Sequence, residues 1–213
     1  MPREESREAA EKAHLRRLQA ESFKDIMKLR ELASKAQRES SEYKHKSEIY
    51  ETKSMEETHK AITCREESHK LLEECDMLRK LIEDLKRFLE HPDKIEDPGS
   101  LPSVSIKTGV SGFFYRMKLR SYKKYLLGTD PIKKDRARRE LMLLIQRENQ
   151  NISKLTNRSR TLEEKASRHT RKASEHKERA AKFLEESVRY QRESEEITNR
   201  ADRLQASIAH EIK

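Results

Sequence analysis

Two long stretches of the chain repeat small or apolar residues at alternating spacings of three and four positions. The first repeat ends at Leu89 and the second begins at Leu141, and neither contains a skipped position. A seven-residue period kept for about ten heptads is typical of a coiled coil, in which each helix presents one stripe to its partner. An unfolded polar chain would not keep this register. The sequence therefore predicts an all-α fold built on two long helices.

Glycine and proline indicate where the two helices stop. All four glycines and four of the five prolines lie between Pro92 and Pro131. Both residue types interrupt helices, and the flanking stretches are rich in the good helix formers Glu, Lys, Arg, Ala and Leu. The prediction is a coiled-coil helix over residues 3–91, a tip over 92–131, and a second coiled-coil helix over 132–213.

The two helices are expected to fold back on each other. Both stripes are most apolar beside the tip, which favours an antiparallel coiled-coil hairpin whose facing residues have numbers that sum to about 230. In that register Tyr50 faces Ala180 and Ser47 faces Phe183, so a large side chain meets a small one in each layer. The competing arrangement is an extended dimer of two parallel coiled coils.

The stripes become poor in large side chains away from the tip. Serine, alanine and histidine replace leucine there, and Cys64 and Cys75 also fall on the stripe, where we expect them to act as small apolar residues. A two-helix contact of this kind buries little apolar surface. We therefore expect self-association, as a homo-oligomer or a larger assembly, to complete the burial.

The tip differs in kind from the long helices. Residues 92–110 are predicted to form a loop with a short extended piece at 104–106, and residues 113–127 a short helix. Asp130 followed by a proline predicts the N-cap of the second long helix. Six residues form the predicted aromatic face of the short helix, which would cover the open end of the two-helix contact: Phe113, Phe114, Met117, Ser121, Tyr122 and Tyr125.

The net charge of the chain is concentrated at the tip and just beyond it. Residues 101–139 contain eleven Lys or Arg and two acidic residues, which equals the net charge of +9 of the whole chain. A concentrated positive field attracts acidic partners and weakens as salt rises. The predicted partner-binding residues are basic or aromatic members of this segment: Phe113, Phe114, Arg116, Lys118, Arg120, Tyr122, Lys123, Lys124, Lys133, Lys134, Arg136, Arg138 and Arg139.

Three kinds of partner suit this basic segment. The first is an acidic protein surface, which predicts a structural or scaffolding protein that acts as a rod or spacer. The second is nucleic acid, whose phosphates residues 107–139 would neutralise, although no known reading motif is present. The third is an anionic membrane surface, to which a basic amphipathic pattern would tether the chain.

The sequence contains no pattern typical of catalysis. It has no glycine-rich phosphate loop and no His, Cys or carboxylate cluster at metal-ligand spacing, so we expect no enzyme activity, cofactor, metal or small-molecule substrate. Two cysteines, no secretory signal and no apolar run of spanning length favour an intracellular, cytoplasmic protein, including a cytoskeletal one, with a nuclear location left open.

Overall fold

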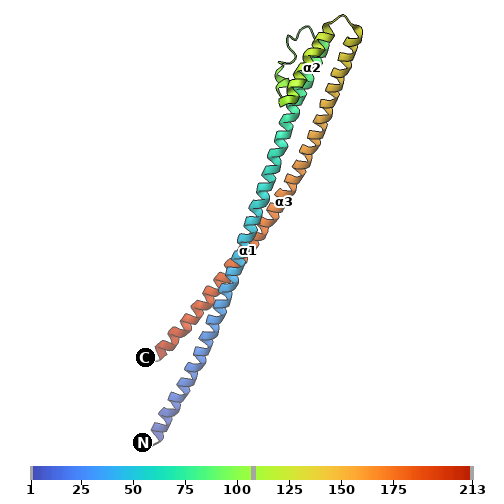
Figure 1. Cartoon of the computed structure of the whole chain (residues 1–213). Helices are drawn as coiled ribbons and strands as arrows, with labels where there is room; N and C mark the ends of the chain where they lie inside the picture. The colour runs from blue at the N-terminus through green and yellow to red at the C-terminus, as the bar shows by residue number, and fades with distance from the viewer. Residues whose placement is uncertain (1, 107–108, 212–213) are drawn as a thin grey trace. The chain divides into compact units, whose positions relative to one another are not determined.

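The computed structural model is helical throughout most of its length (Figure 1). It describes the backbone of residues 2–106 and 109–211, within which there is no strand. The elements are α1 (Pro2–Glu90), the short 3₁₀ helix η1 (Pro102–Ile106), α2 (Gly109–Leu127) and α3 (Pro131–Glu211). The all-α prediction is confirmed, and the two long helices pack closely against each other. Residues 104–106, predicted to be extended, belong to η1 instead.

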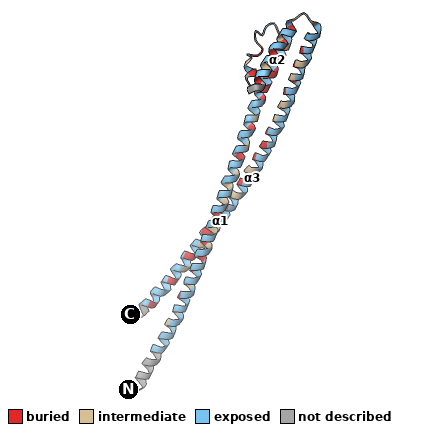
Figure 2. Cartoon of the chain, in the orientation of Figure 1, coloured by how far each residue is buried: buried red, intermediate tan, exposed pale blue. Residues whose placement is uncertain are grey.

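The predicted stripes are the faces that the two long helices bury (Figure 2). Every stripe position of α1 from Gln19 to Leu89 is buried or half-buried. The same is true of α3 from Leu141 to Ile208, except for Leu204, which is 36% exposed. Burial therefore follows the heptad period that the sequence predicts. The side chain of Leu15 and residues 212–213 of the predicted helices lie outside the described part of the chain.

The chain divides into two compact units, of which the first pairs residues 1–57 with residues 171–213. In this unit α1 and α3 meet through small residues. The Ser47 hydroxyl donates a hydrogen bond to the carbonyl oxygen of Ala180 at 2.9 Å. The hydroxyls of Ser40 and Ser187 donate to each other's carbonyl oxygens, again at 2.9 Å. The same kind of bond joins Ser54 to Ala173 and Ser194 to Ala33.

Aromatic rings in this unit contact other rings rather than small residues. Tyr43 stacks on Tyr190 with ring centroids 5.5 Å apart, and its ring also contacts Phe183. The ring of Tyr50 lies 5.4 Å from Phe183 and 5.7 Å from His176. The prediction that a large residue faces a small one in each layer is therefore wrong. Small residues face small residues, as Ser47 faces Ala180, and bring the two helices close together. The aromatic residues at the stripe positions in between then contact each other beside these close approaches.

The offset between the helices explains this difference. Residues joined by the serine bonds have numbers that sum to 227, against the predicted value of about 230. Neighbouring stripe positions are three or four residues apart, so a shift of three residues gives each stripe residue a different facing partner. The second unit comprises residues 58–170. There the hydroxyls of Ser68 and Ser159 lie 2.8 Å apart, and their residue numbers also sum to 227. Cys75 is fully buried in this stripe and Cys64 is half-buried.

The second unit also contains an apolar core formed by α1, α2 and α3 with one residue of η1. In it α2 lies beside the last turns of α1 and the first turns of α3 (Figure 1). We call its buried residues the head cluster: Leu78, Leu81, Ile82, Leu85, Phe88, Val104, Leu119, Tyr122, Leu126, Ala137, Leu141 and Ile145. Leu81 and Phe88 do not belong to the heptad stripe, yet both are fully buried, because a third helix covers this side of α1.

The buried face of α2 is not the one that its aromatic residues predict. Leu119 and Leu126 are buried, and Tyr122 is the one residue of the predicted face that is buried with them, whereas Phe113 and Phe114 of that face are 52% and 64% exposed. Met117, Ser121 and Tyr125 of that face are exposed as well. The helix also lies along α1 and α3 instead of covering the end of their contact. Its leucines lie on the buried face because they join the apolar cluster that contains Leu81 and Phe88.

The turn between α2 and α3 is capped as the sequence predicts. The Asp130 carboxylate accepts hydrogen bonds from the backbone N–H groups of Ile132 at 3.0 Å and Lys133 at 3.3 Å. These are N–H groups of the first turn of α3, which have no acceptor within the helix. The bond from the Lys133 backbone is the main reason that the pKa of Asp130 is lowered. The cap therefore fixes where α3 begins, close to the end of α2.

Candidate docking surface

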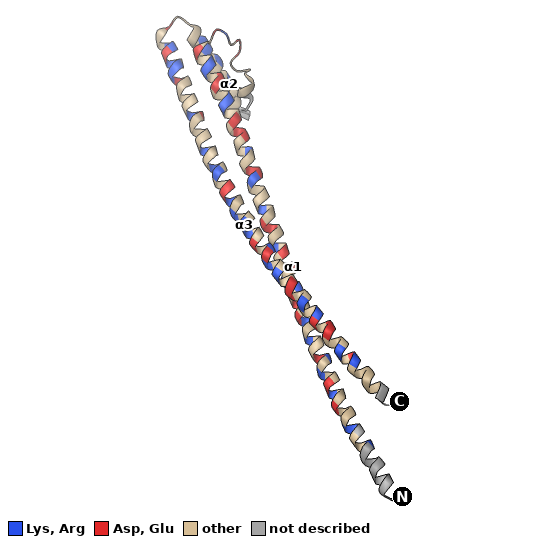
Figure 3. Cartoon of the chain, turned by 180° about the vertical axis from the view of Figure 1, so that it is seen from behind, with Lys and Arg blue, Asp and Glu red and all other residues tan. Residues whose placement is uncertain are grey.

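The predicted partner-binding residues all lie in the second unit, on α2 and on the first turns of α3. Elsewhere along α1 and α3, basic and acidic residues are interspersed (Figure 3). By contrast, no acidic residue occurs between Asp97 and Asp130. The structure thus places the cations of α2 beside those of early α3. Residues 107–108, at the start of the predicted phosphate-binding stretch, lie outside the described part of the chain.

Two of the predicted cations, Arg120 and Lys123, bond to the loop that precedes η1 and are therefore not free to bind a partner. The Arg120 guanidinium donates two hydrogen bonds to the Asp97 carboxylate, at 2.9 and 2.6 Å. Lys123 Nζ donates to the carbonyl oxygens of Ile95 at 2.6 Å and Glu96 at 2.7 Å. The Arg120 bonds, helped by the backbone N–H of Gly99, lower the pKa of Asp97 from 3.8 to about 2. These side chains therefore fasten the loop to α2.

Three more of the predicted residues meet at one carboxylate of α3. The Tyr122 hydroxyl donates to Glu140 Oε2 at 2.6 Å, and Lys118 Nζ lies 3.0 Å from the same oxygen. Arg136 reaches the other oxygen at 3.5 Å. The Tyr122 bond, followed by that of Lys118, lowers the pKa of Glu140 from 4.5 to about 2. The contact with Tyr122, together with Glu140, raises the pKa of Lys118. This cluster joins α2 to α3.

The phenol of Tyr115 lies on the inner side of α2. Its hydroxyl oxygen is buried and has no hydrogen-bond partner among the described residues. Burial is the main reason that the pKa of this phenol is raised, and the negative charge of Glu148 raises it further. Tyr115 packs against the head cluster, so it helps to seat α2.

Four predicted cations point outward without an ion pair among the described residues. Two others on α3 have local partners, since Lys133 pairs with Asp130 at 3.3 Å and Arg139 pairs with Asp135. Lys124 and Arg138 are exposed, and Arg116 and Lys134 are half-exposed. We call these four the outward cations: Arg116, Lys124, Lys134 and Arg138. They are available to a partner without breaking an ion pair among the described residues.

Apolar side chains share the outer side of α2 with some of these cations. Phe113, Phe114 and Met117 are 52%, 64% and 48% exposed. The two rings contact each other edge to face, with centroids 5.9 Å apart. We call these three residues the apolar patch. Large apolar side chains that gather on a surface mark interaction sites more often than single exposed ones do.

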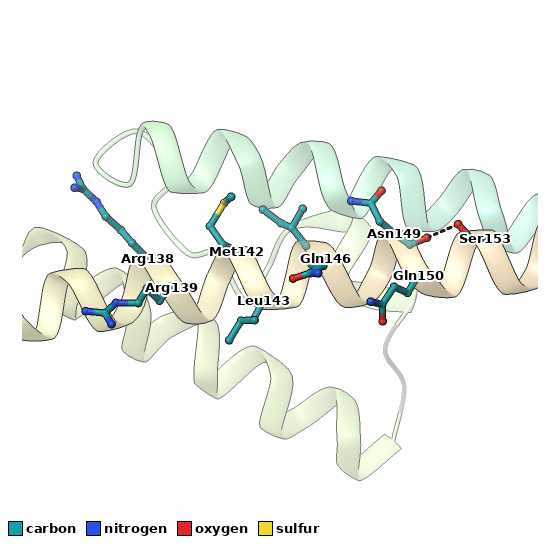
Figure 4. Close-up of a pocket in the computed structure, with 9 residues that line it drawn as sticks. Arg138, Arg139, Met142, Leu143, Gln146, Asn149, Gln150 and Ser153 are labelled. Atoms are coloured by element: carbon teal, nitrogen blue, oxygen red, sulfur yellow. Dashed lines mark hydrogen bonds between the residues drawn. The ribbon is translucent and has the colours of Figure 1, made fainter.

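A second exposed surface lies on α3 and was missed in the sequence (Figure 4). Met142 and Leu143 are 56% and 61% exposed and project from α3 in different directions. Arg138 and Arg139 lie at one end of this surface, and amide side chains lie at the other. A signal was present, because residues 141–145 are five apolar residues in a row and a heptad stripe uses only two of them.

The described residues show neither a group of His, Cys, Asp and Glu placed to hold a metal ion nor a helix that could cross a bilayer. His176 is one of the histidines on the stripe, and its ring contacts the ring of Tyr50. We found no match to this chain among protein-family models, curated proteins or solved structures.

Proposed function

We propose that this chain is a non-enzymatic scaffold or spacer, built as a long antiparallel coiled-coil hairpin, whose basic head docks on an acidic surface. The observation that supports it most directly is the presence of the four outward cations on α2 and early α3. The neighbouring cations are used within the chain, and the head cluster holds both helices in place. A rigid display of unpaired positive charge is suited to binding an extended anionic surface.

The serine bonds support the hairpin. Within the first unit, Ser47 bonds to Ala180 and Ser40 to Ser187, so the number on α3 falls as the number on α1 rises. Ser68 and Ser159 follow the same rule within the second unit. Each long helix is continuous from one end to the other. A single offset is what one unbroken antiparallel contact requires.

Electron spin resonance can test the hairpin. Cys64 and Cys75 would be replaced by serine and alanine, and spin labels attached to cysteines placed at the exposed positions Ser41 and Glu185. Diluting labelled chains with unlabelled ones restricts the signal to one molecule. The hairpin predicts a separation within about 30 Å, given the spacing of packed helices and the label linkers. An extended chain would separate the labels by roughly 200 Å, which would end the hairpin model.

The docking proposal predicts that the outward cations are needed for binding, whereas exposed lysines elsewhere on the chain are not. Lys124→Glu, Lys134→Glu and Arg138→Glu together should abolish retention on a polyglutamate resin at low salt and leave the helical circular dichroism signal unchanged. Retention of wild-type protein should fall as salt rises, because screening shortens the range of the attraction. In a control variant, Lys24, Lys28 and Lys35, which are exposed on α1, are replaced by glutamate. Equal loss of retention in the control would show that only total charge matters.

Self-association belongs to the same proposal. The Ser and Ala stripe buries little apolar surface, and each unit exposes further apolar side chains, such as Leu184 and Val188 in the first and Met142 and Leu143 in the second. Light scattering should show a molar mass above one chain that increases with concentration. A constant mass of one chain over a hundredfold range of concentration would remove self-association from the proposal.

A further inference from the structure

The structure points to an anionic phospholipid bilayer as the acidic surface that α2 meets. We infer that the apolar patch enters the lipid interface while Lys124 and Arg116 meet the negatively charged headgroups. This inference rests on the proposed function, because it names the chemistry of the partner that the head would dock.

The first reason is that the outer side of α2 is both apolar and basic. Phe113, Phe114 and Met117 occupy adjacent turns, and Lys124 follows Met117 by seven residues, which places it on the same side of the helix two turns further on. Helices that lie in a membrane interface combine exposed aromatic side chains with flanking Lys and Arg. An acidic protein tail or the phosphate backbone of a nucleic-acid duplex would neutralise the cations but leave the apolar patch in water.

The second reason is the absence of negative charge from the whole segment around α2. Residues 98–129 contain six Lys or Arg and no acidic residue. Two carboxylates that contact α2 are already paired, since Asp97 bonds to Arg120 and Glu140 to Lys118. An anionic bilayer is a broad negative surface, and a carboxylate on the approaching face would be repelled by it. The net positive charge of this segment is therefore complementary to anionic lipid.

The third reason is that α2 is already folded and fixed with its apolar patch outward. Leu119 and Leu126 anchor its inner side in the head cluster, and Glu140 is bonded to its Tyr122. Docking would therefore not have to order this helix, an entropic cost that a disordered basic peptide must meet when it binds. Only three apolar side chains would insert, so binding should also need charge attraction and weaken as salt rises.

Co-sedimentation of the full chain with lipid vesicles tests this inference. Vesicles of phosphatidylcholine with about 30% phosphatidylserine would be compared with pure phosphatidylcholine at low salt. Wild-type protein should sediment only with the anionic vesicles. The variant Phe113→Ser/Phe114→Ser should bind at least about tenfold more weakly, since each ring loses its burial in the interface. Its helicity and unfolding midpoint should not change, because both rings lie outside the head cluster.

A matched control removes equally exposed apolar side chains elsewhere. Phe23 and Met27 are 55% and 66% exposed on α1, and Phe23→Ser/Met27→Ser should bind anionic vesicles as well as wild-type protein does. For charge, Arg116→Glu/Lys124→Glu should abolish vesicle binding, whereas Lys24→Glu/Lys28→Glu should not. Unchanged binding of the Phe113→Ser/Phe114→Ser variant would overturn the inference.

The polyglutamate resin separates this inference from the proposed function. Retention on polyglutamate without binding to anionic vesicles would overturn the lipid partner and leave the docking proposal standing. Failure with both probes would overturn both. Preference for a mixed-sequence oligonucleotide over the vesicles would also overturn the lipid partner, and would favour nucleic acid as the acidic surface.

Discussion

The head cluster and the first unit hold the same two helices together by different means. In the head, the fully buried side chains include Phe88, Leu81 and Leu119, contributed by α1 and α2. In the first unit, most buried positions are alanine or serine, such as Ser47 and Ala180. Both regions keep the heptad period. The period therefore fixes which face is buried, but not what the burial contributes to stability.

This difference assigns separate tasks to the two regions. Burying a leucine or phenylalanine contributes about 1.5–3 kcal/mol, so a few such residues can hold α2 against α1 and α3. A serine in a helix contact contributes mainly a hydrogen bond, worth about 1 kcal/mol, and permits a short distance between helices. The head is suited to fix a surface, whereas the serine stripe is suited to hold two helices over a long distance with little apolar material.

The largest effect should follow from a cavity in the head. Leu119→Ala removes a fully buried side chain and should lower the free energy of unfolding by about 2–5 kcal/mol. Leu127→Ala, at a position of the same helix that is 51% exposed, should change it by less than about 0.5 kcal/mol. Urea unfolding followed by circular dichroism measures both. Equal effects of the two substitutions would mean that α2 does not pack as described.

The serine stripe should be destabilised by added side-chain volume, whereas the head is destabilised by lost volume. Ser47→Leu adds bulk where α1 and α3 approach closely, and should destabilise the first unit by about 1–3 kcal/mol. Ser41→Leu adds the same side chain on the exposed side of α1 and should be nearly neutral. Thermal unfolding compares the two. A stabilising effect of Ser47→Leu would show that the stripe has room for an ordinary leucine contact.

The stripes themselves could be predicted from sequence because their period is a property of helix geometry. The pairing across the stripe could not be predicted. Tyr43 fits opposite Ser187 in one offset and between Phe183 and Tyr190 in another, and both offsets keep the heptad spacing. Three positions separate these choices. The choice depends on how the side chains of both helices pack together, which the repeat of each helix does not show.

The candidate surface could be located from sequence, but its residues could not be sorted. The charge count singles out residues 101–139. Nothing in the local sequence shows that Arg120 bonds to Asp97, which lies 23 residues earlier. The sequence also does not show which face of α2 is buried, because apolar residues recur every three or four positions on two of its faces. The face with Leu119 is buried because it joins the apolar residues of α1 and α3 in the head cluster, which the sequence of α2 alone does not show.

A smaller effect should distinguish a bond between helices from a bond within one. Ser47 donates across to α3, whereas Ser41 donates to the carbonyl oxygen of Gln37, four residues earlier on its own helix. Ser47→Ala should cost about 0.5–1.5 kcal/mol, the usual contribution of a buried hydrogen bond. Ser41→Ala should be neutral or slightly stabilising, since alanine is the better helix former. Equal results would indicate that the serines of the stripe act only through their small size.

The smallest effect concerns the carboxylate that joins α2 to α3. Because the pKa of Glu140 is lowered from 4.5 to about 2, its ionised form stabilises the head above about pH 4.5. This contribution should disappear as the pH falls from about 4.5 to about 2. It should stay below about 1 kcal/mol, since the Glu140 side chain is 31% exposed to screening solvent.

Glu140→Gln cannot ionise, so its urea midpoint should fall less than that of wild-type protein between pH 6 and pH 3. Glu164→Gln removes an exposed ion pair with Arg160 and should leave the acid response as it is in wild-type protein. An acid response of Glu140→Gln equal to that of wild-type protein would show that α2 is held by the apolar contacts of Leu119 and its neighbours alone.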